Sequence, residues 1–332
     1  MFEGKKYIYE VYKTRNFSRA AENLYIAQPS LSAIVKKIET KLGAPIFDRS
    51  TSPLQLTECG ERYIRCIEKL MDMENEFDNY LNDLEGLHTG HLSIGGSNLF
   101  VSYILPPVLT EFMKKYPGVE IDLIESNTKN LERMLFTGNL DFVIDNYPFP
   151  NTVYERHLFH TEELLLAVPA SLAGGSLADG SSTVGSMAVS PSAADREALL
   201  QKCRMTSEDI RNNRHLEAGA ETVSLKLFAD APFLLLRAGN DTRERSDRLL
   251  TQAGIHQPKV LLSLDQQITA YHLSCYGMGI AFVADTLIKN VPADERIVFF
   301  KPEGTENRRN IYFYHKRNRY MTSAMDAFLK QI

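Results

Sequence analysis

The residues with the clearest chemical potential lie on one face of a helix predicted over residues 29–42. Ser30, Ser32 and Ala33 occupy its first two turns, and Lys36 follows on the same side. Hydroxyl groups near the start of a helix can bond to base edges in a DNA major groove, and cations further along can meet phosphates. The same pattern also fits an amphipathic helix whose polar face is simply solvated, so the helix alone leaves both interpretations open.

The opposite face of this helix is apolar at helical spacing, which predicts that it packs on a second element. These apolar positions are Leu31, Ile34, Val35, Ile38 and Leu42. A shorter helix precedes it, with Ser18 as the expected N-cap and the small Ala20 and Ala21 on its inner side. Only a tight turn fits between the two helices, and Gly43 can end the second in a left-handed cap. The pattern therefore predicts a helix-turn-helix.

A small two-stranded wing is predicted beside this pair, from residues 45–49 and 54–56. Arg49 ends the first strand, where its guanidinium could reach a phosphate backbone. Thr57 is the expected N-cap of a new, long helix.

Together, the first sixty residues resemble the winged helix-turn-helix of the LysR-type transcriptional regulators. The matching residues are Phe17-Ser18-Arg19-Ala20-Ala21, Leu24, Gln28-Pro29-Ser30-Leu31-Ser32, Ile34, Ile38-Glu39, Leu42-Gly43, Phe47-Asp48-Arg49 and Leu56-Thr57-Glu58-Cys59-Gly60. The resemblance implies a non-enzymatic regulator that binds double-stranded promoter DNA, with RNA polymerase kept open as a further partner. It implies DNA contacts by Ser18, Arg19, Gln28, Pro29, Ser30, Ser32, Ala33, Lys36 and Arg49.

The charge distribution agrees with a protein that touches nucleic acid at one end. Residues 1–65 hold eleven Lys and Arg against seven Asp and Glu, whereas residues 66–88 hold one Lys against seven acids. A basic head therefore precedes an acidic segment. Without a run of eighteen apolar residues or an apolar leader, we expect a cytoplasmic protein with no membrane partner.

One long helix is predicted over residues 57–88, with apolar residues at alternating intervals of four and three. The seam residues are Ile67, Leu70, Phe77, Leu81 and Leu84. The narrow stripe favours pairing with a second helix, although a helix lying on its own domain is the alternative. In LysR-type proteins this segment is the linker helix that pairs two subunits, which implies a homodimer and further a homotetramer, as a dimer of dimers.

From residue 90 onwards, strand and helix patterns alternate, which predicts an α/β fold with parallel strands. The resemblance implies an effector-binding domain over 90–332, built as two subdomains like a type 2 periplasmic binding protein. Subdomain I is expected over about 90–166 and 266–332, and subdomain II over about 167–265. A Gly-, Ser- and Ala-rich stretch within an insert near 171–220 departs from the family pattern and leaves its position open.

A ligand cleft is predicted where strand ends meet helix starts, because free N–H groups there favour polar and anionic ligands. The family resemblance adds weight to the hydroxyl-bearing loop after the first strand. Helix capping alone is an equal explanation for Thr128. The candidate effector residues are Ser97, Asn98, Phe100, Thr128, Asn146 and Gln266.

No sequence pattern supports an enzyme, a metal centre or a cofactor. Gly277-Met278-Gly279 lacks the third glycine of a dinucleotide fingerprint, and the eight histidines show no metal-ligand spacing. Two alternatives stay open. One is a redox-sensing regulator in which Cys203 and Cys275 form a disulfide; the other is an enzyme or solute-binding protein with an incidental helix-turn-helix.

Overall fold

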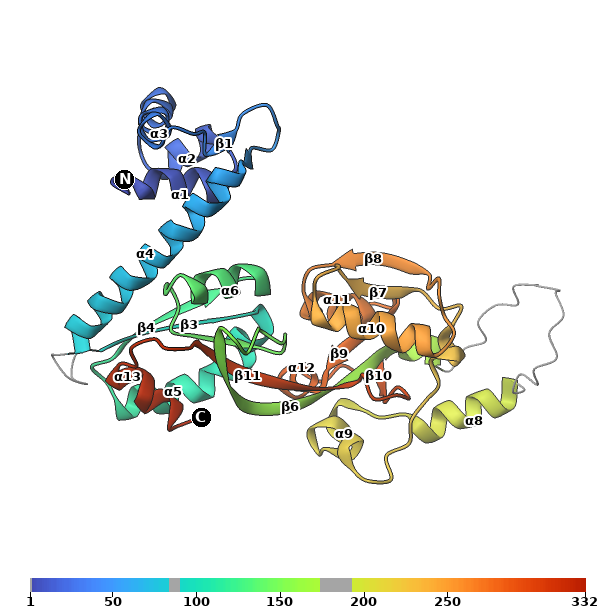
Figure 1. The fold of residues 1–332 in the computed structure, drawn as a ribbon. Helices are drawn as coiled ribbons and strands as arrows, with labels where there is room; N and C mark the ends of the chain where they lie inside the picture. The colour runs from blue at the N-terminus through green and yellow to red at the C-terminus, as the bar shows by residue number, and fades with distance from the viewer. Residues whose placement is uncertain (1, 84–89, 174–192) are drawn as a thin grey trace.

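The computed structural model describes residues 2–83, 90–173 and 193–332. A helical head at the N-terminus is joined by the long helix α4 to a body of two α/β lobes (Figure 1). Among the described residues, no helix is long and apolar enough to cross a membrane.

The head consists of three short helices and a two-stranded wing. Its elements are α1 (Lys5–Thr14), α2 (Phe17–Asn23), α3 (Gln28–Leu42), β1 (Phe47–Asp48) and β2 (Gln55–Leu56). Leu31 and Val35 of α3 are fully buried against the small Ala20 and Ala21 of α2. The apolar stripe of α3 therefore packs as its spacing predicts, and its polar face is left outside.

The caps of these helices differ in one place from expectation. Ser18 does not cap α2; the helix begins two residues earlier than that cap would place it, and the Asn16 side chain accepts hydrogen bonds from the Ser18 and Arg19 N–H groups. Asn and Ser are comparable N-caps, so sequence alone could not separate them. Gly43 ends α3 with a φ of 79°, the left-handed cap expected there.

Helix α4 (Glu58–Asp83) starts against the wing and continues the head's core. Gly60 lies so close to the wing that an added Cβ would stand 2.0 Å from the Ile46 carbonyl oxygen. Ile67 is fully buried in the head, together with Tyr63. The expectation that Ile67 belongs to an intersubunit seam is therefore wrong: this turn of α4 lies on its own domain.

The exposed apolar face of α4 begins further along the helix. Met73, Phe77 and Leu81 recur at helical spacing and are 65%, 59% and 45% exposed, whereas Tyr80, 41% exposed, packs edge-on against Tyr320 of the body. Leu70 is half-buried, and Leu84 lies outside the described residues. The free stripe is consequently shorter than the heptad pattern predicts.

The opposite side of α4 is attached to the body. Asp72 forms an ion pair with Lys316, and Glu76 accepts a hydrogen bond from the Tyr320 N–H group. The Asn75 amide donates to the Thr137 carbonyl oxygen at 3.1 Å. These contacts hold the linker helix on the first lobe.

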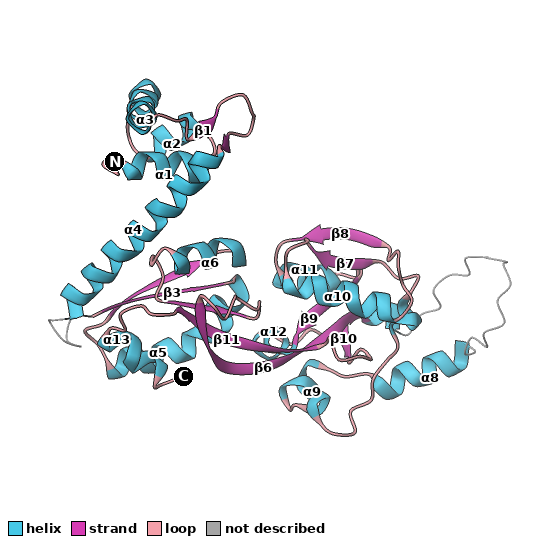
Figure 2. Cartoon of the chain, in the orientation of Figure 1, coloured by secondary structure: helices cyan, strands magenta, loops and turns pink. Residues whose placement is uncertain are grey.

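The body contains a single nine-stranded sheet that passes through both lobes (Figure 2). Its strands are β3 (His91–Gly96), β4 (Glu120–Glu125), β5 (Phe142–Asp145), β6 (Tyr154–Pro169), β7 (Phe233–Leu236), β8 (Val260–Leu264), β9 (Ile280–Ala284), β10 (Ile297–Phe300) and β11 (Arg308–Lys316). The order is β4-β3-β5-β11-β6-β9-β7-β8, with β10 paired to β6. The long β6 therefore joins the two lobes.

The first lobe places parallel β3, β4 and β5 beside antiparallel β11 and the first half of β6. Helices on both faces cover these strands (Figure 1). They are the π-helix η1 (Phe100–Ile104), α5 (Leu105–Lys115), α6 (Thr128–Phe136) and α13 (Ser323–Leu329).

The second lobe contains parallel β7, β8 and β9, with β9 and β10 antiparallel to the second half of β6. Its helices are α10 (Asp241–Gln252), α11 (Gln267–Cys275) and α12 (Asp285–Asn290). Strands β9 and β10 belong to this lobe by their pairing, and α11 belongs to it because it packs on β9 and β7. The chain therefore returns to the first lobe just before β11, not near residue 266 as expected, because β9 pairs with β7 and β6.

The insert adds α7 (Ala170–Ala173), α8 (Ala193–Cys203), α9 (Ser207–Arg211), η2 (Arg214–Leu216) and η3 (Leu225–Phe228). Bridges from Met205 to Phe299 and from Val223 to Pro302 attach it to the second lobe. Residues 174–192, which include most of the Gly- and Ser-rich stretch, lie outside the described residues.

Candidate functional site

The first candidate surface is the outer face of α3. Gln28, Ser30, Ala33 and Lys36 are exposed, and Ser32 is half-buried. Pro29 stands in the first turn, where a missing N–H group leaves no bond unmade. The face therefore presents small polar groups first and a cation two turns later.

The neighbouring α2 and wing border this face. Ser18 and Arg19 are exposed at the start of α2, and Arg49 is exposed at the end of β1. The Arg49 guanidinium bonds to Glu39 at 3.0 Å and lies 5.1 Å from the centre of the Phe17 ring. Arg49 therefore also ties the wing to α3 and α2, a structural role that the sequence did not show.

Tyr25, in the turn before α3, is a surface residue that sequence reasoning missed. Its side chain is 95% exposed, and its φ of 54° lies in the left-handed region. A large aromatic side chain so fully exposed contributes little to the core. The signal available in the sequence was an aromatic residue in a turn too short to bury it.

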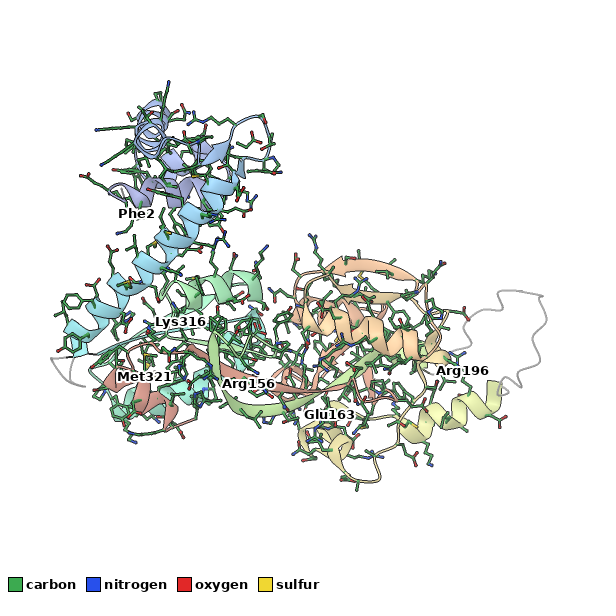
Figure 3. All side chains as sticks on the ribbon, viewed as in Figure 1. Phe2, Arg156, Glu163, Arg196, Lys316 and Met321 are labelled. Atoms are coloured by element: carbon green, nitrogen blue, oxygen red, sulfur yellow. The ribbon has the colours of Figure 1, made fainter. Side chains whose placement is uncertain are left out.

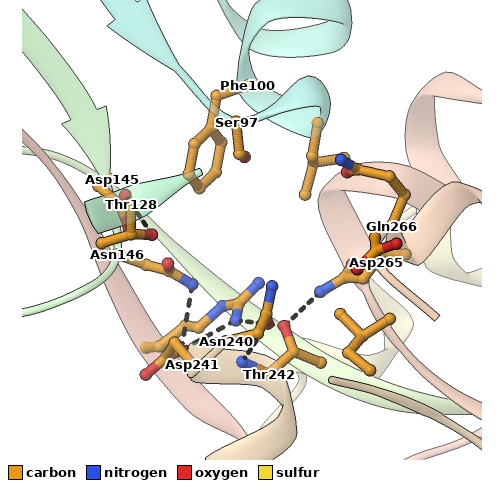
Figure 4. A pocket seen from close by; sticks show the side chains of 14 residues that line it. Ser97, Phe100, Thr128, Asp145, Asn146, Asn240, Asp241, Thr242, Asp265 and Gln266 are labelled. Atoms are coloured by element: carbon orange, nitrogen blue, oxygen red, sulfur yellow. Dashed lines mark hydrogen bonds and ion pairs between the residues drawn. The ribbon is translucent and has the colours of Figure 1, made fainter. Parts of the chain in front are cut away.

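The second candidate site is a cleft between the two lobes, shown in Figure 4. Ser97 lines it from the loop after β3 and Phe100 from the start of η1. Thr128, Asp145 and Asn146 line it beside them from the same lobe. The second lobe contributes the residues Leu236, Asn240, Asp241, Thr242, Asp265, Gln266 and Gln267. The cavity volume is about 50 Å³, which is room for a few water molecules.

A buried ion-pair network forms the floor of this cleft. The Arg309 guanidinium is 2% exposed, donates to Asp241 at 2.9 Å and pairs with the fully buried Glu162 at 2.6 Å. Asn146, from the first lobe, donates to the same Asp241 carboxylate at 3.1 Å. Arg245, one turn along α10, also pairs with Asp241 at 2.9 Å, so Asp241 is one point at which the two lobes are joined across the cleft.

Asp145 is a second buried carboxyl group in the cleft. It accepts hydrogen bonds from the Thr128 hydroxyl at 3.0 Å and from the Tyr147 N–H group at 2.8 Å. Burial raises the pKa of Asp145 to about 6, because desolvation outweighs these bonds to the charged form. The cleft therefore carries three aspartates, Asp145, Asp241 and Asp265, against Arg309 as the cation in its lining.

The structure brings five of the six candidate effector residues together. Ser97, Phe100, Thr128, Asn146 and Gln266 all line the cleft, whereas Asn98 does not. The Asn98 amide instead donates to Glu125, at the end of β4, at 3.2 Å. The expectation for Asn98 is wrong, because its side chain is bonded to Glu125 and is not part of the cleft lining.

Sequence reasoning missed the charged residues of the cleft. Asp241 could have been found, because it follows a predicted strand and starts a helix, as Thr128 does. Arg309 gave no local signal, since it lies on an antiparallel strand whose position depends on the whole sheet.

Comparison with known proteins decides the family. The model of the LysR substrate binding domain matches residues 85–202 and 211–332. The model of the bacterial regulatory helix-turn-helix protein of the lysR family matches residues 4–61. The chain belongs to the LysR family. It is therefore a LysR-type transcriptional regulator with an effector-binding domain, and not an enzyme.

Individual relatives are distant from this LysR-type regulator. It is 27% identical to the uncharacterized HTH-type transcriptional regulator YcgK of Bacillus subtilis strain 168, over 98% of this chain and 91% of that protein. The crystal structure of full-length CbnR with its target DNA has a TM-score of 0.58 at 16% identity and covers 100% of this chain and 98% of that chain. The effector-binding domain of QuiR in complex with shikimate has a TM-score of 0.52 at 16% identity and covers 73% and 95%.

The thiols of this LysR-type regulator do not favour the redox alternative. Cys203 and Cys275 are both buried and belong to different hydrophobic clusters. Burial raises the pKa of the Cys275 thiol to about 11 and also raises that of Cys203. Both groups are protonated at neutral pH, and the thiolate is the reactive form.

Proposed function

We propose that this regulator binds promoter DNA through the outer face of α3 and controls that binding through a polar ligand held in the cleft. One observation carries the proposal: an exposed reading face and an enclosed polar cleft lie in separate parts of the chain, connected by α4. A ligand that changes how the lobes close would act on the end of α4 that is held at Asp72 and Glu76.

At the DNA surface, Ser30, Ser32 and Ala33 read base edges, with Gln28 and Pro29 at the entry of α3. Lys36 contacts phosphate, as a cation two turns into the helix can. The remaining proposed contacts flank the groove and come from Ser18, Arg19 and Arg49, to which the structure adds Tyr25. Arg49 contributes in part through the wing, because its guanidinium is already bonded to Glu39.

A second copy of the chain pairs with α4 through the face formed by Met73, Phe77 and Leu81. One recognition helix reads few base pairs, and two copies read two half-sites. The same face is too apolar to remain in water without cost. We therefore propose a homodimer, extended to a homotetramer in the family's manner, acting in the cytoplasm and with RNA polymerase as a further partner.

The ligand chemistry follows from the charges of the cleft. Arg309 is already neutralised by Glu162 and Asp241, so an anionic ligand must displace a carboxylate to reach it. Asp145 can instead accept hydrogen bonds from hydroxyl or ammonium groups, whereas Asp241 is already bonded to Arg309, Arg245 and Asn146. Of the ligand heads that the sequence left open, the cleft favours a hydroxyl-rich or amine-bearing head over a simple anion. Phe100 supplies an apolar wall beside it (Figure 4).

The test is a thermal-shift screen of the full chain against three matched sets of metabolites: polyols, amines and simple carboxylates. A ligand present at about 100 times its Kd raises stability by roughly 2.7 kcal/mol. We expect hits among polyols or amines, and the hits should change the affinity for a DNA fragment that the protein selects from a random library.

Matched variants then locate the ligand. Ser97→Ala should weaken binding of the hit by about 1–3 kcal/mol, since it leaves a buried polar partner unmet. Asn98→Ala, one residue away and outside the cleft, should leave it unchanged. Equal losses in both variants, or in neither, would place the ligand elsewhere. A hit that binds with no effect on DNA affinity would contradict the proposed control.

A further inference from the structure

A cluster of three metal-binding side chains lies outside the cleft, at the far end of the β6–β11 strand pair. Glu155 and His157 stand two residues apart on β6, and His315 stands on β11 directly opposite Glu155 in the strand register. One ligand atom from each residue lies within 4.8 Å of the others. The two histidines are 158 residues apart in sequence, so their spacing gave no sign of a site.

The nitrogen atoms have the separation that a shared cation requires. The Nε2 atoms of His157 and His315 are 3.1 Å apart, and their rings stack with centroids 5.1 Å apart. Two imidazole nitrogens bound to one Zn²⁺ at about 2.0–2.1 Å would be separated by roughly 3–3.4 Å at octahedral to tetrahedral angles. The Oε2 atom of Glu155 lies 3.7 Å from His315 Nε2, so a small side-chain rotation completes the set.

Neighbouring groups hydrogen-bond to two of the three side chains and orient them, as second-sphere groups do in metal sites. The Nδ1 atom of His315 lies 3.2 Å from the Lys316 carbonyl oxygen, to which a protonated Nδ1 donates. Such a bond leaves Nε2 unprotonated and directed at His157. Arg317 bonds to Glu155 through Oε1 at 3.2 Å, which holds that carboxylate with Oε2 towards His315.

The three side chains are already close together, and solvent can reach them. His315 is buried, whereas Glu155 and His157 are half-exposed, so a cation has both a fixed ligand and a route from solvent. Three protein ligands leave room for water at further positions. The next residue after His315 is Lys316, labelled in Figure 3, whose ion pair with Asp72 holds the linker helix. A cation here would fasten β6 to β11 beside that attachment.

We propose that Glu155, His157 and His315 form a binding site for a divalent first-row transition-metal ion. Two imidazoles and one carboxylate suit Zn²⁺, Ni²⁺, Co²⁺ or Fe²⁺ and do not suit Mg²⁺ or Ca²⁺, which prefer oxygen ligands. The proposal departs from the sequence-based expectation of no metal site, and it does not depend on the cleft or on its ligand.

The experiment uses the full chain, treated with a chelator, dialysed and kept reduced. Zn²⁺ binding is measured by titration calorimetry, and Co²⁺ is added separately to record its visible absorption. We expect one equivalent of Zn²⁺, and a Co²⁺ spectrum typical of nitrogen and oxygen ligands. His157→Ala, at a half-exposed position, should weaken Zn²⁺ binding at this site by at least about ten-fold.

His160→Ala is the matched control, because it removes an exposed imidazole from the same strand outside the cluster. It should bind Zn²⁺ like the wild type. Glu155→Gln, which keeps the shape of the side chain, should weaken Zn²⁺ binding and alter the Co²⁺ spectrum. Equal Zn²⁺ affinity in the wild type and in His157→Ala would overturn the proposal, as would a wild-type protein that binds none of Zn²⁺, Ni²⁺ and Co²⁺.

Discussion

Replacement of Asp145 by Asn should change how the stability of the body depends on pH. The carboxyl group is completely buried in the cleft, and burial raises its pKa from 3.8 to about 6. A difference of about two pKa units corresponds to roughly 3 kcal/mol between the protonated and charged forms. That free energy is the penalty for keeping a charged carboxylate at this position.

The sign follows from proton binding. Between about pH 4 and pH 6 the folded chain holds a proton at Asp145 that the unfolded chain has released, so the stability contributed by this group falls as pH rises. Below pH 4 both states are protonated, and above pH 6 the penalty is complete. Asn does not titrate, so the stability of Asp145→Asn relative to wild type should rise by about 3 kcal/mol from pH 4 to pH 7.

Urea unfolding of both proteins at half-unit pH steps measures this difference. Other titrating groups are present in both proteins, so their effects on stability cancel in the comparison. One is Asp285, whose bonds to His215 and Lys289 lower its pKa to about 2 despite its burial. Thr128→Val is a second variant: it removes a donor to the charged form and should push the pKa of Asp145 higher. Parallel stability curves for wild type and Asp145→Asn would refute the reasoning.

Three further variants test assembly, the head and the cleft floor. Leu81→Asp should dissociate the dimer in sedimentation, because an unpaired charge in an interface costs several kcal/mol. The control Asp78→Asn should leave the dimer intact. An unchanged oligomer in Leu81→Asp would argue against pairing through the α4 face. Gly60→Ala should destabilise the head in thermal unfolding by roughly 1–3 kcal/mol or more, because its Cβ meets the Ile46 carbonyl; wild-type stability would contradict that contact. Arg309→Met should cost about 3–5 kcal/mol in urea unfolding, because the fully buried Glu162 loses its cation while Asp241 keeps Arg245, and a smaller loss would show that Arg309 does not stabilise the buried Glu162 charge.

The local elements of this fold could be predicted where the chain's own periodicity determines them. The apolar stripe of α3 and the loop after β3 were recognisable because neighbouring residues carry the signal. The sequence does not predict the first half of β6, because residues 154–163 mix charged, polar and apolar side chains without a regular apolar alternation. The seam of α4 was predicted too long, since a heptad pattern does not distinguish packing on the same chain from packing on another copy.

The site residues, too, differ in whether local sequence or long-range strand pairing determines their position. Ser97 and Thr128 follow from the rule that ligands bind at strand ends, which needs only local element assignments. Arg309 and the pair of His157 and His315 depend on where β11 lies in the sheet. Pairing between strands so distant in sequence is decided by the packing of the whole body, and one sequence does not reveal it.

The most direct test of the central claim is a salt titration of DNA binding by fluorescence anisotropy. The wild type is compared with Lys36→Ala on α3 and with Lys114→Ala, which removes an exposed lysine from α5 of the body. If α3 binds DNA, Lys36→Ala should weaken binding to all sequences and reduce the slope of log K against log salt by about 1. Lys114→Ala should match the wild type in both affinity and slope. A wild-type slope and affinity for Lys36→Ala would contradict the assignment of α3 as the DNA-reading helix.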